Sequence, residues 1–536
     1  MTDDNYISLF DSTLRDGAQT QGVDFGVTDK LAITLALDRL GLDYVEGGWP
    51  GANPTDDAFF AEPPAVENTR FVAFGMTRRP GRSAGNDPSL AALVNAKVRV
   101  ACIVGKAWDF HVDVALGISR AENLAMIGDS VAHLARSKDE VLFDAEHFFD
   151  GYKSDPGYAI ECLRAAHGAG ARWVVLCDTN GGALPGEVER IVAKVTAEIP
   201  GSHVAIHCHN DTENAVANSL AAIGAGARQI QGTINGLGER CGNANLVSLI
   251  PTLKLKTDFE IGVSDQQLER LTGVSHLLDE RLNRAPDAFA AYVGDSAFAH
   301  KGGLHASAVE KDPRTYEHID PALVGNRRHV VISDQAGRSN MLARFRELDI
   351  DAEMADGEIN SLIETVKARE FEGYAYDGAE ASFELLARRA LGEVPHFFKL
   401  SRFRLMDDRR WNARGELVTE SEATVTIEVG AGAHMEVATG NGPVNALDNA
   451  IRKALLPLYP QLEDMRLVDY KVRILTPQAG TRAVTRVMIE SADDAGRRWT
   501  TVGVSPNIID ASFNALHDGI TWKLMQEGAE VPAPAP

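Results

Sequence analysis

Short apolar runs alternate with longer amphipathic stretches over the first half of the chain. The runs are rich in apolar, β-branched and aromatic residues and predict eight strands: Ile7–Phe10, Tyr44–Glu46, Phe71–Phe74, Val98–Val104, Val141–Phe143, Trp173–Cys177, Val204–Cys208 and Gln229–Gly232. Apolar positions at helical spacing between them predict helices, among them Asp29–Leu40, Arg120–Ser137, Tyr158–Ala166, Glu187–Ile199 and Asn214–Ala222. Eight strand–helix units that repeat roughly every thirty residues indicate a (β/α)₈ TIM barrel over residues 1–265. A doubly wound sheet is the alternative, but the chain lacks the Gly-rich phosphate fingerprint of that fold, so we expect a closed barrel.

The pattern changes after residue 265 and becomes mainly helical. Ser264–Asn283 has apolar residues on one face and predicts one or two helices, and further helices are expected at Asn340–Leu348 and Asp356–Arg369. A polar, glycine-containing passage, Ala299–His305, interrupts this pattern. The stretch contains too many apolar residues to be disordered. We therefore expect helical linker subdomains over residues 266–394.

Strands dominate again beyond residue 395. The expected strands are Phe397–Met406, Glu422–Glu428, His434–Ala438, Tyr470–Leu475, Ala483–Ser491 and Arg498–Val504. Two helical segments follow similar turns, Gly440–Ala446 and Gly503–Ala511, each with a proline near the helix start. These features predict an α+β domain over residues 395–525, with a faint internal repeat of a strand–strand–helix unit. Residues 526–536 end in VPAPAP and are expected to be a disordered tail.

Composition narrows the class of protein. The chain has 536 residues and a formal net charge of −23, so a nucleic-acid-binding surface is not expected. No apolar stretch approaches membrane-spanning length. The five cysteines form no CxxC pair, which indicates free thiols in a reducing compartment. The acidic N-terminus enters a strand at once and does not resemble a signal peptide, so we expect a cytoplasmic protein without membrane partners.

The motif Ile206-His-Cys-His-Asn-Asp211 is the most informative chemical signal. Side chains alternate along a strand, so His207 and His209 point the same way, with an amide and a carboxylate directly after them. A lone pair of strand histidines is more often satisfied by backbone partners. Here a second cluster, Asp11–Gln19, closes the first strand with Arg15 and Asp16 side by side. The two clusters together favour nitrogen and oxygen ligands for one divalent metal ion.

Other polar clusters also fall where the predicted strands end, which is where a barrel keeps its active site. Glu46 is placed to hold the Arg15 guanidinium; the alternative is a purely structural ion pair, and both can be true. Glu146 and Thr179 close the fifth and sixth strands. The Gly-rich loop 232–243 follows the last strand, and taken alone it equally fits a plain strand–helix connection.

Six segments resemble, in order, the signatures of the metal-dependent acyl-CoA condensing enzymes. This family includes the 2-isopropylmalate, homocitrate and citramalate synthases and, more distantly, the hydroxymethylglutaryl-CoA lyases. The segments are LRDGAQ, DYVEGGWPG, FDAEHFFDG, DTNGG, HCHND and NGLGERCGN. The wording EGGWPGANPTD looks most like the citramalate synthase branch. The resemblance covers nearly the whole chain, and it implies that the helical region is the family's linker and that residues 395–525 form its regulatory domain.

The resemblance also assigns roles to residues of the barrel. It implies that Asp16, His207 and His209 bind a divalent metal ion, with Asn243 as a further ligand. Mg²⁺ or Mn²⁺ is expected from the family, and the histidine pair is also compatible with Co²⁺ or Zn²⁺. Arg15, held by Glu46, would polarise the keto oxygen of an α-keto acid. Thr179 would bind the carboxylate of that substrate.

The catalytic base has two candidates by the same resemblance, Glu146 and His305, and Tyr316 is expected to assist. We expect His300 to make only a structural hydrogen bond. In this family the helical subdomain reaches over a partner's barrel. His305 and Tyr316 would therefore act in a second subunit, which implies a homodimer with a shared active site.

The resemblance to the citramalate synthase branch implies an acyltransferase. Such an enzyme condenses acetyl-CoA with pyruvate and hydrolyses the thioester, giving citramalate and CoA. From the same resemblance we expect a place in isoleucine biosynthesis. We also expect feedback inhibition by isoleucine bound to residues 395–525. Isopropylmalate or homocitrate synthesis is the runner-up, and a lyase is a distant third. The alternative of another class is a catalytically silent ligand-sensing scaffold. Loss of Arg15 or of a metal ligand would favour it, and none is lost.

Overall fold

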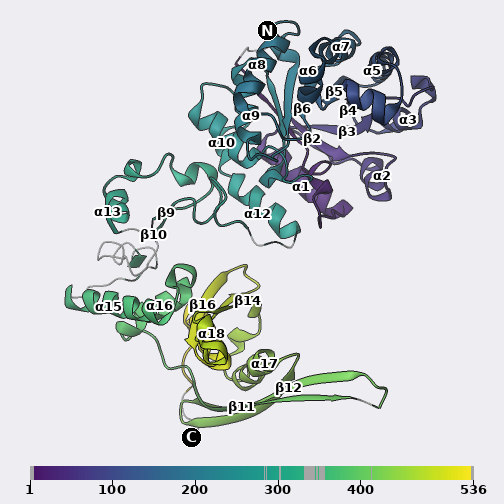
Figure 1. The fold of residues 1–536 in the computed structure, drawn as a ribbon. Coiled ribbons are helices and arrows are strands. Elements are labelled where there is room, and N and C mark those ends of the chain that lie inside the picture. The colour runs from purple at the N-terminus through teal and green to yellow at the C-terminus, as the bar shows by residue number, and fades with distance from the viewer. Residues whose placement is uncertain are drawn as a thin grey trace. The chain divides into compact units, whose positions relative to one another are not determined.

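The computed structural model describes residues 5–282, 284, 286–300, 303–330, 344–345, 348, 350, 356–411 and 413–532. These residues form two compact units, which are described separately (Figure 1). The barrel unit comprises residues 1–298 with 318–329. The C-terminal unit comprises residues 299–317 with 330–536.

The barrel unit contains a closed barrel of eight parallel strands, each paired with the next along the chain. The strands are β1 Ser8–Asp11, β2 Tyr44–Gly48, β3 Arg70–Met76, β4 Val100–Lys106, β5 Glu140–Glu146, β6 Trp173–Asp178, β7 Val204–Cys208 and β8 Gln229–Gly232. The ring closes where β1 pairs with β8, in a register that joins Ser8 to Gln229 and Asp11 to Gly232. The predicted (β/α)₈ barrel is confirmed, and the apolar runs coincide with its strands.

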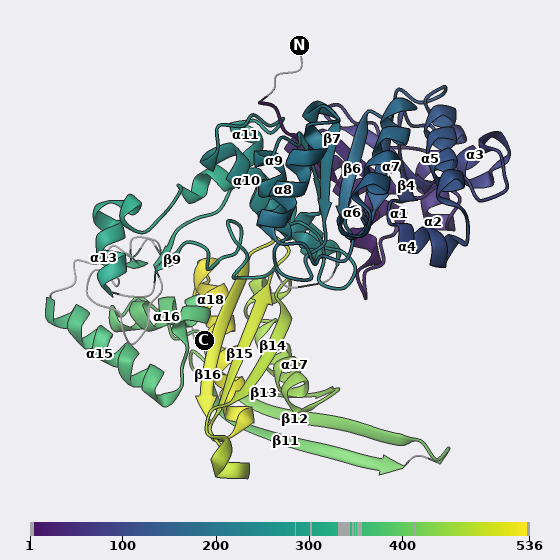
Figure 2. The ribbon, with the colours of Figure 1, turned by 45° about the horizontal axis from the view of Figure 1, so that its top comes forward.

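Helices surround the barrel (Figures 1 and 2). They are α1 Val27–Leu40, α2 Pro54–Ala61, α3 Pro88–Asn95, α4 Asp109–His111, α5 Arg120–Leu134, α6 Phe148–Ser154, α7 Pro156–Gly168, α8 Pro185–Thr196, α9 Ala215–Gly224 and α10 Leu246–Lys256. Local sequence sets their starts: the side chains of Asn53, Ser119 and Asp155 cap α2, α5 and α7 by accepting from backbone N–H groups of the first turn. An apolar layer between strands and helices forms the main core, and a smaller cluster fills the barrel interior.

The predicted helical stretch Ser264–Asn283 resolves into two helices, α11 Asp265–Leu268 and α12 Leu271–Arg281. Leu271 and Leu278 of α12 belong to the same apolar core as the barrel helices. The chain therefore divides into compact units near residue 298, further along than the expected barrel boundary at 265. The predicted helix Asn340–Leu348 lies largely outside the described residues.

The C-terminal unit begins with the helices α13 Gly303–Lys311, α15 Asp356–Glu372 and α16 Glu380–Ala390. The short strands β9 Ala299–His300 and β10 His329–Val330 form a two-stranded sheet. Two antiparallel three-stranded sheets follow, and each has a helix against it. The first has β11 Lys399–Trp411, β12 Leu417–Val429 and β13 Gly432–Gly440, with α17 Pro443–Leu455; the second has β14 Arg466–Ile474, β15 Thr485–Ala492 and β16 Arg498–Ser505, with α18 Ile508–Gln526. Figure 2 shows β11 and β12 running out together as a long ribbon. The α+β prediction is confirmed.

One detail of the C-terminal sequence interpretation needs correction, and the glycines before both helices have a packing role. The repeating unit has three strands and a helix, because an edge strand, β11 or β14, completes each sheet. Gly440 and Gly503 are matching close-packing positions: a Cβ at Gly440 would lie 2.5 Å from Ala446 N, and one at Gly503 would collide with Ala511 O. These glycines let a strand touch the first turns of α17 and α18.

The tail also starts later than expected from composition. Helix α18 runs to Gln526, and Glu527 forms ion pairs with Arg497 and Lys523. Ala529 is buried. The expected disordered tail therefore does not begin at residue 526, and residues 533–536 lie outside the described part of the chain. Among the described helices, none is both long and apolar enough to cross a membrane.

Candidate active site at the carboxyl ends of the barrel strands

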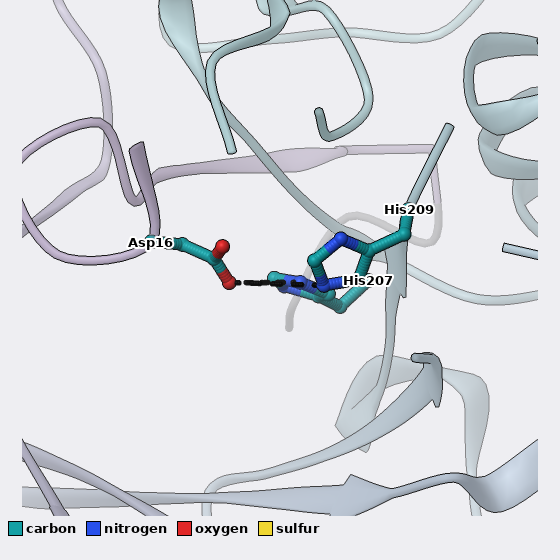
Figure 3. A group of neighbouring side chains, drawn as sticks. All are labelled: Asp16, His207 and His209. Atoms are coloured by element: carbon teal, nitrogen blue, oxygen red, sulfur yellow. Dashed lines mark ion pairs between the residues drawn. The ribbon is translucent and has the colours of Figure 1, made fainter. Parts of the chain in front are cut away.

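Asp16, His207 and His209 converge at one edge of the barrel (Figure 3). Asp16 lies in the turn after β1, His207 is on β7, and His209 directly follows that strand. Asp16 Oδ2 lies 3.4 Å from His207 Nε2 and 4.0 Å from His209 Nε2. All three side chains are buried. Within the described residues, this is the one group of three or more histidines, cysteines or acids whose ligand atoms are close enough to share a metal ion.

Asn243 completes this group and tests whether a cation fits. Its Nδ2 donates to Asp16 Oδ1 at 3.0 Å and to the carbonyl of Leu237 at 3.1 Å. Its Oδ1 is buried without a hydrogen-bond partner among the described residues. A buried acceptor without a donor costs about 1–3 kcal/mol unless another group satisfies it. Carboxylate, imidazole and amide donors suit a divalent cation, so the residues present fit a metal ion.

Electrostatics favour the metal-binding forms of Asp16 and His209. Burial alone would raise the pKa of Asp16, but Arg15 and the neighbouring histidines hold it well below its usual range. Burial and the adjacent His207 lower the pKa of His209 to about 4. Asp16 is therefore an anion and His209 a neutral imidazole near neutral pH. Those are the protonation states that metal coordination requires.

The Gly-rich loop after β8 has a geometric reason for its glycines. Gly242 has a φ of +91°, and a Cβ there would collide with the carbonyl of Gly236. A Cβ on Gly238 would collide with Asn243 Nδ2. The glycines thus let the loop fold tightly enough to place Asn243 against Asp16. The loop is part of the site and not a plain connection.

Arg15 lies beside the metal group and is surrounded by acids. Its Nε donates to Glu46 Oε2 at 2.7 Å, and one terminal nitrogen donates to Asp16 Oδ2 at 2.9 Å. The other terminal nitrogen is 4.0 Å from Asp144 Oδ2, and the guanidinium carbon lies 4.0 Å from the ring centroid of Phe74. Burial opposes the charged form, but these three carboxylates raise the pKa of Arg15. The predicted Arg15–Glu46 pair is present, and it fixes the guanidinium at the barrel edge.

Glu146 and Thr179 lie at the ends of the neighbouring strands. Glu146 ends β5 and forms an ion pair with Lys106 at the end of β4; both side chains are partly exposed. Thr179 follows β6, and its hydroxyl oxygen accepts from the backbone N–H of His147 at 2.8 Å. Among the described residues, no acceptor lies within hydrogen-bond distance of the Thr179 hydroxyl hydrogen, so this hydroxyl can donate to a substrate oxygen.

His305 and Tyr316 belong to the C-terminal unit, whereas the residues above belong to the barrel unit. Their ring centroids are 4.2 Å apart, and Tyr316 is 47% exposed. The structure thus brings these two candidates together in one unit. His300 Nε2 lies 3.0 Å from Glu317 Oε1, which gives it the kind of structural partner expected.

Three buried polar residues that sequence reasoning did not select also shape the site. Asp144 is on β5, two positions before Glu146 and therefore on the same face, and Gln231 is on β8. Lys30 of α1 donates to the carbonyls of Leu14 and Gly47 at 3.1 and 2.9 Å and forms a buried ion pair with Asp56. It thereby ties the segments that carry Arg15 and Glu46. The period-two strand pattern was the available signal for Asp144; nothing local in the sequence distinguishes Lys30 from a surface lysine.

Comparisons with known proteins agree along the whole chain. Three family models match: HMGL-like over residues 6–276, homocitrate synthase post-HMGL domain-like over 292–372, and LeuA allosteric (dimerisation) domain over 377–524. The chain is 49% identical to a protein of Aquifex aeolicus named (R)-citramalate synthase, over 98% of this chain and 99% of the relative. It is 50% identical to one of the same name from Geobacter sulfurreducens, over 97% of each chain. A probable 2-isopropylmalate synthase of Methanopyrus kandleri is 32% identical over 96% of this chain and 97% of the relative.

Proposed function

The chain belongs to the (R)-citramalate synthase family, with an HMGL-like barrel, and on that premise we propose that it condenses acetyl-CoA with pyruvate and hydrolyses the thioester to release citramalate and CoA. One observation carries the proposal. A partly buried arginine, Arg15, is held by Glu46 and lies beside Asp16, the carboxylate of the metal group. This arrangement is suited to binding an α-keto acid and to stabilising negative charge on its keto oxygen. The intact constellation argues against a silent scaffold.

The side chains divide the chemistry between them. A divalent cation held by Asp16, His207, His209 and Asn243 would supply Lewis-acid polarisation of the keto acid. Arg15 donates hydrogen bonds to the keto oxygen and stabilises the alkoxide that develops there. Thr179 donates to the substrate carboxylate.

We assign the proton transfer to Glu146. Its carboxylate takes a proton from the methyl group of acetyl-CoA, and the resulting carbanion attacks the keto carbon to form the new carbon–carbon bond. The alkoxide then takes up a proton. Water cleaves the thioester, which releases CoA and makes the reaction irreversible. The Glu146 side chain forms an ion pair with Lys106 and is partly exposed, so a substrate can reach it.

His305 and Tyr316 are the alternative source of proton transfer. We propose that they act on the barrel of a second subunit in a homodimer, and the match of residues 377–524 to a dimerisation domain supports this arrangement. We propose Mg²⁺ or Mn²⁺ as the native ion, with Co²⁺ and Zn²⁺ as alternatives, because a site of two imidazoles with oxygen ligands accepts all four.

The pocket walls predict a preference for pyruvate. Trp49 lies edge-on to Phe74 with ring centroids 5.4 Å apart, and Phe74 also lies against the Arg15 guanidinium. We propose that these rings limit the space beside the keto acid, so that a larger side chain meets steric overlap. We expect kcat/KM for pyruvate to exceed that for 2-oxoisovalerate and 2-oxoglutarate by about 10–200-fold. This is the usual discrimination by a hydrophobic pocket between substrates that differ by one methylene group.

A CoA-release assay with acetyl-CoA and a panel of α-keto acids tests this function. Trp49→Ala should admit larger keto acids and so reduce the ratio of kcat/KM for pyruvate to kcat/KM for the larger substrates. Trp411 is an exposed tryptophan of the C-terminal unit, and Trp411→Ala should leave this ratio unchanged. A higher kcat/KM for 2-oxoisovalerate or 2-oxoglutarate would replace this proposal with isopropylmalate or homocitrate synthesis. No CoA release with any keto acid would support the scaffold alternative.

We further propose that isoleucine binds the C-terminal domain and inhibits the enzyme, which places the reaction in isoleucine synthesis. The match to an allosteric domain supports this proposal, as do the two helix N-termini that follow the repeated sheets. Asn507 caps α18 by accepting from the backbone N–H of Ile509. Asn507→Asp keeps that cap and adds a negative charge that repels an amino acid's carboxylate.

Isoleucine should therefore inhibit the unaltered enzyme more strongly than leucine does, and Asn507→Asp should raise the inhibitory concentration about 5-fold or more at unchanged basal activity. Asn507→Ser is the neutral control, because serine also caps helices. Substitution is preferable to truncation at residue 395. Ser382 and Arg389 of α16 both bind Asp518 of α18, so truncation would also remove the partners of α16. Equal inhibition of all three proteins would place the effector site elsewhere.

A further inference from the structure

Gln231 connects one of the histidines of the metal group to a buried acid. It lies on β8 directly opposite His207 of β7, and only 1% of its surface is exposed. His207 Nδ1 lies 3.0 Å from Gln231 Oε1. Gln231 Nε2 in turn donates to Asp144 Oδ1 at 3.4 Å. The three side chains form a buried chain of hydrogen bonds across β7, β8 and β5.

This chain fixes which nitrogen of His207 carries hydrogen. The structure orients the amide of Gln231 with its NH₂ group towards Asp144 and its oxygen towards His207. An amide oxygen only accepts, so in this orientation His207 donates from Nδ1. The lone pair of His207 is then on Nε2, the nitrogen that faces Asp16. A metal-binding imidazole needs its free lone pair on this side.

The other histidine has no such support. His209 Nδ1 is buried without a hydrogen-bond partner among the described residues. The two imidazoles of the metal group are therefore unequal, because only His207 has a hydrogen bond to its Nδ1 among the described residues. Asp144 also accepts from Cys102 Sγ at 3.3 Å, which helps to fix the far end of the chain.

We propose that Gln231 and Asp144 are positioning residues that set the tautomer of His207 and thereby the metal affinity of the enzyme, an inference that rests on the metal site of the proposed function. Loss of the hydrogen-bond partner of a metal-binding histidine typically weakens metal binding about 10–100-fold. Gln231→Met keeps the volume of the side chain and removes both hydrogen bonds. Asp144→Leu removes the acceptor that orients the amide.

The experiment is a titration of the full-length, metal-free enzyme with Mn²⁺, followed by calorimetry and by electron paramagnetic resonance, with no substrate present. Gln231→Met should raise the Kd for Mn²⁺ about 10–100-fold. Gln231→Glu keeps an oxygen opposite His207 Nδ1 and can share a proton with Asp144, so it should restore the Kd to within about 5-fold of the unaltered value. Adding Asp144→Leu to Gln231→Met should weaken binding little further, because both substitutions break one chain.

Gln229→Met is the matched control. Gln229 is a buried glutamine on the same strand, two residues before Gln231, and neither polar atom of its side chain has a partner among the described residues. Its substitution should leave the Kd unchanged. Equal Mn²⁺ affinity in Gln231→Met and the unaltered enzyme would overturn the inference while leaving the metal site standing. Mn²⁺ binding that survives His207→Ala would instead overturn the metal site itself.

Discussion

His207→Ala and His209→Ala should each lower kcat by about 10³-fold or more, because metal and electrostatic stabilisation supply a large part of the barrier reduction in such reactions. Both side chains are buried and lie near Asp16. Asn243 donates to the same Asp16, and its side-chain oxygen is buried without a partner among the described residues. Each substitution removes one ligand and leaves that oxygen unsatisfied. Metal content should fall together with turnover, measured by elemental analysis after gel filtration and by CoA release.

His203→Ala is the control for these two variants. His203 precedes the same strand at its amino end, and its Nδ1 bonds to the carbonyl of Arg172 at 2.9 Å, far along the strand from the metal group. His203→Ala should keep stoichiometric metal, and its kcat should stay within about 3-fold of the unaltered enzyme, because His203 lies outside the metal group. Folded His207→Ala and His209→Ala proteins with full metal content and normal kcat would show that the assignment is wrong.

Glu146→Gln should lower kcat by about 10²–10⁴-fold, the usual contribution of a general base. The amide keeps the size of the side chain and its contact with Lys106 but does not accept a proton near neutral pH. Because Glu146 is not part of the metal group, Mn²⁺ affinity should stay unchanged, so the effect should appear in kcat and not in metal binding. Steady-state kinetics with pyruvate, together with an Mn²⁺ titration, separates the two quantities.

Glu140→Gln controls for the loss of a carboxylate from the same strand, because Glu140 begins β5 and bonds to the hydroxyl of Tyr44 at the opposite end. It should leave kcat nearly unchanged. If Glu146→Gln stays active while His305→Ala is inactive, the base is His305. Mixing inactive Glu146 and His305 variants would then test the shared site: activity should return in mixed dimers only if one subunit supplies His305 to the barrel of the other.

Sequence patterns predicted the parts of the site that stand at strand ends. Strand period and unusual polar residues placed Arg15, Glu46 and the two histidines correctly, because the carboxyl ends of parallel strands meet at one edge. Gln231 was missed because its role depends on strand register: it faces His207 only when β7 and β8 pair as they do. A polar residue inside a strand has no local feature that reveals such a partner.

Long-range packing explains the other gaps. Lys30 resembles an ordinary helix lysine, yet its ammonium is buried against carbonyls from two different segments. Periodicity found the six strands β11 to β16, but it did not show that they form two sheets of three. The contact between Ser382 of α16 and Asp518 of α18 joins residues that are distant along the chain, and a sequence window does not register it.

The pairing of β1 with β8 also affects how the barrel closes during synthesis. On a ribosome, Ser8–Asp11 must wait for Gly232 before their ring can close, and at ~5–20 residues per second this takes roughly 10–50 s. During that interval, the edge of β1 that pairs with β8 in the finished barrel has no strand beside it. Asp16 is made early, whereas His207, His209 and Asn243 are made much later. A metal ion can bind all of them only in a finished ring, so its binding energy is added to the closure of that seam.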